Sequence, residues 1–124
     1  MNRWCALLAV VTFGLAGCAG VPVEKYRAEK PVLDLRTYFN GTIDAWGMFQ
    51  NRSGEVVKRF TVVIDAHWEG DVGTLDERFS WSDGTSSRRV WTITRQADGR
   101  YLGRADDVVG EAVGEAAGNA LRWQ

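Results

Sequence analysis

Residues that carry most protein chemistry are scarce in this chain of 124 residues, which has one His, two Cys and two Pro. The single His67 cannot form a His-Glu-x-x-His zinc site, and the sequence has no Cys-x-x-Cys pair, Gly-rich phosphate loop or Gly-x-Ser-x-Gly motif. On the strand that we expect here, the His67 ring points away from the core, beside Asp65. We therefore predict no catalytic residues, no metal site and no cofactor.

A dominant charge and a long apolar run are lacking as well. The 15 Lys and Arg residues balance 16 Asp and Glu residues, so there is no basic patch for nucleic acid or for lipid head groups. The apolar segment from Trp4 to Leu15 is too short to span a bilayer as a mature helix. It follows Arg3 and precedes small residues, which is the pattern of a secretory signal peptide.

The signal peptide ends in Leu15-Ala16-Gly17-Cys18. This sequence resembles the lipobox of bacterial lipoproteins, in which the Cys is acylated and the chain is cut just before it. The resemblance implies that residues 1–17 are a lipoprotein signal peptide and that acylated Cys18 holds the chain in a membrane, since several acyl chains anchor stably. In this class an Asp after the Cys retains the protein in the inner membrane. Ala19 stands there, which predicts the outer membrane of the bacterial cell envelope, facing the periplasm.

The alternative is that Cys18 is an ordinary small residue at the end of a plain signal peptide. With lipidation, no thiol remains for a disulfide or a nucleophile, because Cys5 leaves with the signal peptide. Cleavage before Cys18 leaves 124 − 17 = 107 residues, enough for one small domain. Residues 18–32 mix charges with Pro22 and Pro31 and predict a lipidated N-terminus and tether.

Residues 33–124 alternate apolar and polar positions in short runs separated by Gly, which predicts an antiparallel all-β meander. We expect strands at about 33–39, 42–50, 55–68, 74–82, 86–96 and 100–107, with one or two more in 110–124. A four-residue loop at 51–54 would pair Ala45 with Phe60. The inward side chains then form one apolar face, which includes Ile43, Phe60, Val62, Ile64, Trp68, Leu75, Phe79 and Trp81.

Three-residue loops ending in Gly fit the next two hairpins, at 82–84 and 97–99. The first loop places Glu77 opposite Arg89, whereas a two-residue loop would oppose Arg78 and Arg89 unfavourably. The second loop pairs Arg89 with Asp107 and Trp91 with Ala105. Glu77, Arg89 and Asp107 then form a charged trio on the inward face.

The charged trio has two interpretations. It is either a structural ion-pair cluster that fixes strand register, or a group that orients the polar head of a ligand below a rim of Trp68, Trp81 and Trp91. Glu77 and Asp107 also resemble the carboxylate pair of glycosidases. Because Arg89 lies between them, we expect both to stay ionised, which excludes the general-acid role.

Small residues occupy every second position from Gly110 to Ala120. On a strand they form a bare face that leaves volume for a ligand or lets another backbone approach. The alternatives are a weakly ordered Gly-rich hairpin that turns at Gly118-Asn119, or a helix. Three Gly in nine residues would cost such a helix about 3 kcal/mol.

Three stretches carry a further resemblance: Phe39-Asn40-Gly41 to Ala45-Trp46-Gly47, Asp83-Gly84 with Arg89-Val90-Trp91, and Ala105-Asp106-Asp107 to Gly118-Asn119-Ala120. They resemble an uncharacterised family of small proteobacterial lipoproteins, a domain of unknown function. The resemblance implies a lipocalin-like (calycin-type) barrel, and some members are encoded near lipid-modifying enzymes. Since members continue past the position of Trp123, it also implies that this chain is truncated and its barrel incomplete.

We therefore expect a membrane-tethered lipoprotein that is not an enzyme and that binds or carries an apolar ligand, such as a lipid or fatty acyl chain. The alternative is a structural or protein-interaction lipoprotein without a small-molecule ligand. The sequence identifies no protein partner. The expected ligand-facing residues are Phe60, Trp68, Glu77, Phe79, Trp81, Arg89, Trp91, Asp107 and Ala112.

Overall fold

The computed structural model describes residues 20–124. The predicted signal peptide and Cys18 lie outside this range. Two short helical segments, η1 (Val23–Tyr26) and α1 (Leu35–Tyr38), precede seven strands. The strands are β1 (Gly41–Gln50), β2 (Val56–Glu69), β3 (Val72–Trp81), β4 (Ser86–Arg95), β5 (Tyr101–Arg104), β6 (Ala112–Ala117) and β7 (Ala120–Trp123).

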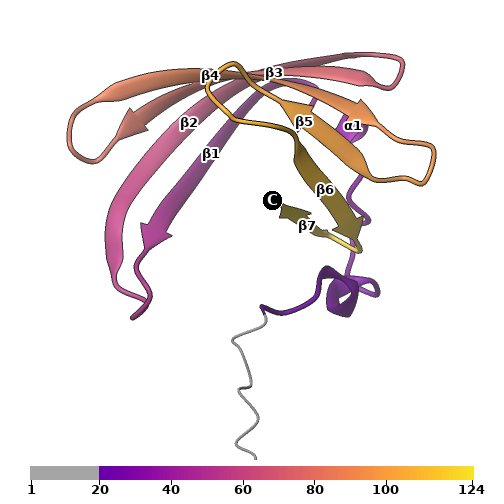
Figure 1. Ribbon diagram of the computed structural model, residues 1–124, viewed down its shortest axis with the longest axis horizontal. Helices are drawn as coiled ribbons and strands as arrows, with labels where there is room; N and C mark the ends of the chain where they lie inside the picture. Colours follow the sequence, from indigo (N-terminus) through magenta and orange to yellow (C-terminus); the bar gives the residue numbers. More distant parts are fainter. Residues whose placement is uncertain (1–19) are drawn as a thin grey trace, which may run out of the picture.

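All seven strands form one antiparallel sheet in which each strand pairs with its neighbours in sequence. The sheet curls into a half-barrel, with β1 and β2 on one side of the arch and β5 to β7 on the other (Figure 1). Within residues 20–124 no ladder joins β1 to β7. The prediction of an all-β meander that forms an incomplete lipocalin-like barrel is confirmed.

The first predicted strand, 33–39, is wrong, because residues 35–38 form the helix α1. Asp34 caps this helix, since its side chain accepts a hydrogen bond of 2.9 Å from the backbone N–H of Thr37. Leu35 is 0 % exposed and packs into the concave face of the sheet. One turn of helix is too short for a helical periodicity, so the alternating pattern misled the prediction.

Part of the segment predicted as a tether also packs on the sheet. Val23 in η1 is buried, and η1 lies against β6 and β7. The turn between these strands, Gly118-Asn119, supplies a carbonyl that accepts a hydrogen bond of 2.8 Å from the N–H of Leu33. The segment before α1 is therefore held to the hairpin that it crosses.

The registers of the central strands follow the prediction. Glu77 lies opposite Arg89, and Arg95 lies opposite Tyr101. The β1–β2 register differs by two residues: Ala45 pairs with Val62 rather than Phe60, because the loop is longer and the ladder is irregular at Phe49 and Gln50. A shift of two residues keeps each side chain on its predicted face, since side chains alternate with period two.

Strand β5 ends at Arg104, earlier than predicted. The predicted ladder pairs of Trp91 with Ala105 and Arg89 with Asp107 therefore do not form. The chain must turn back through residues 105–111 to place β6 beside β5, and this leaves the first part of β4, residues 86–91, without a strand partner on that side.

The concave face holds the core and also places glycines beneath aromatic rings. Gly47 pairs with Phe60, Gly73 with Trp68 and Gly114 with Trp123. A side chain at any of these glycines would overlap the ring opposite it. Such pairing covers the bare backbone of a glycine and lets a sheet bend sharply.

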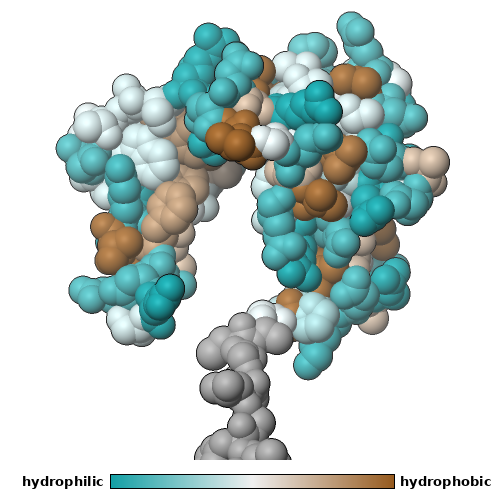
Figure 2. Space-filling view, in the orientation of Figure 1, coloured by the Kyte–Doolittle hydropathy of each residue, from teal (hydrophilic) through white to brown (hydrophobic). Residues whose placement is uncertain are grey.

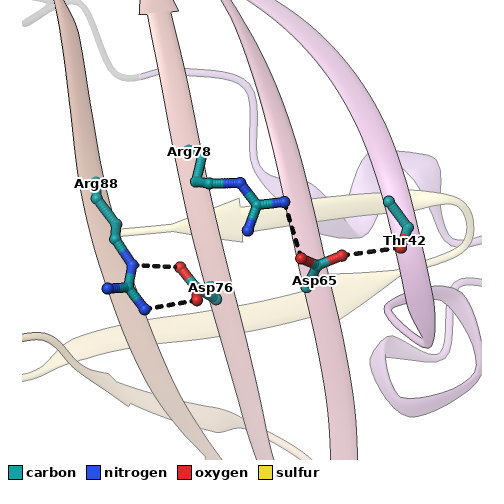
Figure 3. Close-up of polar contacts among 5 residues, drawn as sticks. All are labelled: Thr42, Asp65, Asp76, Arg78 and Arg88. Atoms are coloured by element: carbon teal, nitrogen blue, oxygen red, sulfur yellow. Dashed lines mark hydrogen bonds and ion pairs between the residues drawn. The ribbon is translucent and has the colours of Figure 1, made fainter.

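The convex face carries ion pairs that run across the strands (Figure 3). Asp65 accepts a hydrogen bond of 2.8 Å from Thr42 and forms an ion pair of 2.8 Å with Arg78. Arg88 binds both oxygens of Asp76, at 2.8 and 2.7 Å. Arg78 and Arg88 lie directly opposite each other, and each is offset by a diagonal carboxylate. Exposed pairs of this kind contribute about 0–1 kcal/mol each and mainly favour this register.

Candidate functional site

The inner side of the arch is the candidate site. The two sides of the molecule enclose an open hollow, and apolar side chains gather on part of its wall beside hydrophilic ones (Figure 2). The predicted ligand-facing residues of β2, β3 and β4 all lie on this concave face, as their alternation requires. They fall into two groups, one around Trp81 and the other around Trp91.

The first group is an aromatic cluster of Phe49, Phe60, Phe79 and Trp81. Ring centroids are separated by 5.2 to 6.0 Å, and the Phe79 and Trp81 rings stack. The ammonium group of Lys58 lies 4.4 Å from the centre of the Trp81 ring and 3.2 Å from Asp83. The cluster is not fully covered, since Phe49 is 52 % exposed and the other three rings are half-buried.

The three tryptophans do not form a common rim. Trp68 packs over Gly73, and its indole N–H donates a hydrogen bond of 3.0 Å to the carbonyl of Phe39. The indole N–H of Trp81 donates a hydrogen bond of 2.8 Å to Ser87. Trp91 is 8 % exposed and meets the Trp123 ring edge to face. Trp68 and Trp91 therefore act as core residues, and Trp81 alone belongs to the open cluster.

The charged trio is divided. The guanidinium of Arg89 binds both oxygens of Asp107, with hydrogen bonds of 2.8 to 3.0 Å, and its centre lies 5.6 Å from the Trp91 ring. Among the residues that the structure describes, Glu77 has no ion pair. Asp107 follows the end of β5, so the turn rather than the ladder brings it to Arg89.

Burial raises the pKa of Glu77 to about 7, from an ordinary value of 4.5. The charge of Arg89 and a hydrogen bond from the Trp91 side chain lower the pKa only in part, and the negative charge of Asp107 adds to the increase. The Arg89 pair holds the pKa of Asp107 below its usual value. Near pH 7 the Glu77 carboxyl is therefore only partly ionised, which differs from the expectation that both carboxyls stay ionised.

This raised pKa predicts that the folded chain loses stability as the pH rises. Between pH 4.5 and about 7 the folded state keeps a proton on Glu77 that the unfolded chain has released, so the free energy of unfolding falls across this window. The fall should be absent from Glu77→Gln and present in Glu69→Gln, which changes an exposed carboxyl. Urea unfolding at several pH values measures it. Equal slopes for Glu77→Gln and the wild type would contradict the prediction.

A small hollow with a volume of about 150 Å³ lies beside α1, around Trp91. We call it the Glu77 hollow. It is lined by Leu35, Phe39, Leu75, Glu77, Trp91, Ile93, Leu121 and Trp123. Among the predicted ligand-facing residues only Glu77 and Trp91 line it. Leu35, Phe39, Leu121 and Trp123 were missed, because they come from the helix and the last strand, whose positions over the sheet no local pattern reveals.

The small-residue face does not form the wall of this hollow. Residues 112–117 and 120–123 form the hairpin of β6 and β7, which excludes the helix alternative, and Ala112 is buried in the core. The Trp123 ring lies over Gly103 and Gly114. The space that the small side chains leave is therefore filled by a ring of the protein itself.

Elsewhere, a larger surface hollow of about 690 Å³ lies between the segment before α1 and the β6–β7 turn, lined by Pro31, Val32, Leu33, Asp34, Thr37, Tyr38 and Asn119. Within residues 20–124 no three potential metal ligands gather, and no helix there is long and apolar enough to cross a membrane. His67 lies exposed on the convex face of β2.

Comparison with curated proteins and with solved structures finds no match. Residues 12–124 match the family described as protein of unknown function (DUF3833). The match extends over the whole half-barrel and over the segment that packs on it. This agrees with the resemblance found in the sequence, and the chain belongs to this family of unknown function.

Proposed function

We propose that this chain is an outer-membrane lipoprotein, anchored through acylated Cys18, whose concave face binds an apolar or lipid ligand in the cell envelope. No catalytic step is part of the proposal. The observation that carries it is the partly exposed aromatic cluster beside the Glu77 hollow. Exposed apolar surface on the inside of a curved sheet is typical of ligand sites.

The membrane anchor is tested by changing Cys18 to Ser. The wild-type chain, expressed in a bacterium, should sediment with the outer-membrane fraction and incorporate labelled palmitate. Cys18→Ser should lose the label and leave the outer-membrane fraction, because both the acylation and the cleavage before residue 18 depend on the Cys18 thiol. A Cys5→Ser variant is the control and should behave like the wild type. Palmitate labelling that persists in Cys18→Ser would exclude this anchor.

The ligand is tested by native mass spectrometry of the full chain carrying Cys18→Ser, so that bound lipid is distinguished from covalently attached acyl groups. After exposure to envelope lipids, the chain should retain an adduct of lipid mass. Phe60→Ala in the aromatic cluster should lose most of it. Trp46→Ala is the matched control, since Trp46 is 76 % exposed on the convex face, and it should keep the adduct.

The second candidate is a structural lipoprotein that binds another envelope protein. It is favoured by the exposed Trp46 and Met48 on the convex side of β1, a strand that pairs only with β2 in the described residues. Exposed apolar residues on an unpaired edge are a common site of association. In that case no lipid adduct forms, and Trp46→Ala, rather than Phe60→Ala, weakens binding to the partner protein in the envelope.

A further inference from the structure

The Glu77 hollow contains one charged side chain among seven uncharged ones. Glu77 lies on the inward face of β3 between Leu75 and Phe79, so its carboxyl cannot turn to the outer solvent without breaking the alternation. The cation that acts on it is Arg89, and Arg89 already donates to both oxygens of Asp107. An ionised Glu77 then has a hydrogen bond from the Trp91 side chain but no cation of its own.

The charges around the hollow favour a cation. Glu77, Arg89 and Asp107 sum to −1 + 1 − 1 = −1 when Glu77 is ionised. Farther along the concave face, Lys58 and Asp83 form an ion pair and cancel. A negative carboxylate ligand would meet an uncompensated like charge in apolar surroundings, which is unfavourable. A ligand ammonium group would instead supply the missing partner.

We propose that Glu77 binds the positively charged ammonium head of an amphiphilic ligand, whose apolar chain lies along the concave face. This inference rests on the proposed function. The hollow, at about 150 Å³, has room for roughly five water volumes, which suits a small head group and the first carbons of a chain.

The geometry of β3 indicates the path of the ligand's alkyl chain along the concave face. Glu77, Phe79 and Trp81 follow one another on the inward face of β3, and four residues of a strand span about 13 Å. An alkyl chain that starts at Glu77 therefore runs over Phe79 and reaches the aromatic cluster. The alkyl chain of the ligand would then cover the partly exposed rings of that cluster.

The experiment compares three probes of equal chain length: octylammonium, octanol and octanoate. Binding to the full chain carrying Cys18→Ser is measured by equilibrium dialysis at pH 8, where Glu77 is largely ionised. Octylammonium should bind about tenfold or more tightly than octanol, since a hydrogen bond to a charged group contributes that much. Octanoate should bind more weakly than octanol.

Glu77→Gln keeps the size of the side chain and removes its charge, so it should abolish the preference for octylammonium over octanol. Glu69→Gln, on the exposed end of β2, should keep the preference. A preference for octanoate, equal binding of octanol and octylammonium, or an ammonium preference that survives in Glu77→Gln would each overturn the inference while the apolar site stands. Failure of all three probes to bind would overturn the proposed function and this inference with it.

Discussion

Replacing Gly118 with Ala should lower the free energy of unfolding by about 3 kcal/mol. Gly118 has φ of +58°, a conformation that costs an L side chain about 1 kcal/mol. In addition, its new methyl group would overlap the carbonyl of Tyr26, which belongs to the backbone of η1 and cannot rotate away. Overpacking against such a group costs roughly 1–3 kcal/mol more. Either η1 leaves the hairpin or the turn distorts.

Gly70 provides a matched control for this substitution. It has φ of +60° and, like Gly118, is the first residue of a two-residue turn between paired strands. No atom lies within 4 Å of a methyl group at Gly70. Gly70→Ala should therefore cost only the conformational part, about 1 kcal/mol. Urea unfolding of both variants gives the difference, and equal losses would show that η1 does not hold this turn.

Replacing Leu35 with Ala should lower the free energy of unfolding by about 3 kcal/mol. Leu35 is 0 % exposed, and its side chain joins α1 to the core formed by β2, β3 and β4. Truncating a fully buried Leu typically costs 2–5 kcal/mol, through lost burial and the cavity that remains. Since Leu35 also lines the Glu77 hollow, the cavity should enlarge that hollow.

The control for Leu35 is Val32→Ala in the same segment. Val32 is 63 % exposed, so its truncation should change the free energy of unfolding by less than about 0.5 kcal/mol. Thermal unfolding of the full chain with Cys18→Ser distinguishes the two. If Leu35→Ala has the same melting temperature as Val32→Ala, then Leu35 does not anchor α1 to the sheet, and the hollow beside α1 is not a fixed feature.

Several features of the fold were predictable because they depend on neighbours in the chain. The loop at 82–84 was selected by rejecting an arrangement with Arg78 opposite Arg89, and the observed register places Glu77 there. Yet Arg78 does lie opposite Arg88, where diagonal aspartates offset the repulsion. The like-charge rule by itself therefore does not separate the two loops, whereas the observed register keeps Leu75 opposite Trp91 on the inward face.

The candidate site was less predictable. Its aromatic members, such as Phe60 and Trp81, follow from alternation. Alternation does not predict that Arg89 forms its ion pair with Asp107 rather than with Glu77. That pairing depends on the early end of β5 and on the turn that brings Asp107 to Arg89. The role of Trp123 was equally hidden. A ring that covers Gly103 and Gly114 is placed by the β6–β7 hairpin, and no spacing in the sequence encodes that contact.

The amino-acid order alone determined that this chain is a β-meander with one apolar face, because a strand alternates its side chains at every residue whatever surrounds it. The curl of the sheet, the turn of helix that buries Leu35 and the lone carboxyl of Glu77 were decided only by tertiary structure. These features depend on which distant segments fill the space above a residue. Burial and charge partners come from the whole fold, whereas alternation comes from the chain itself.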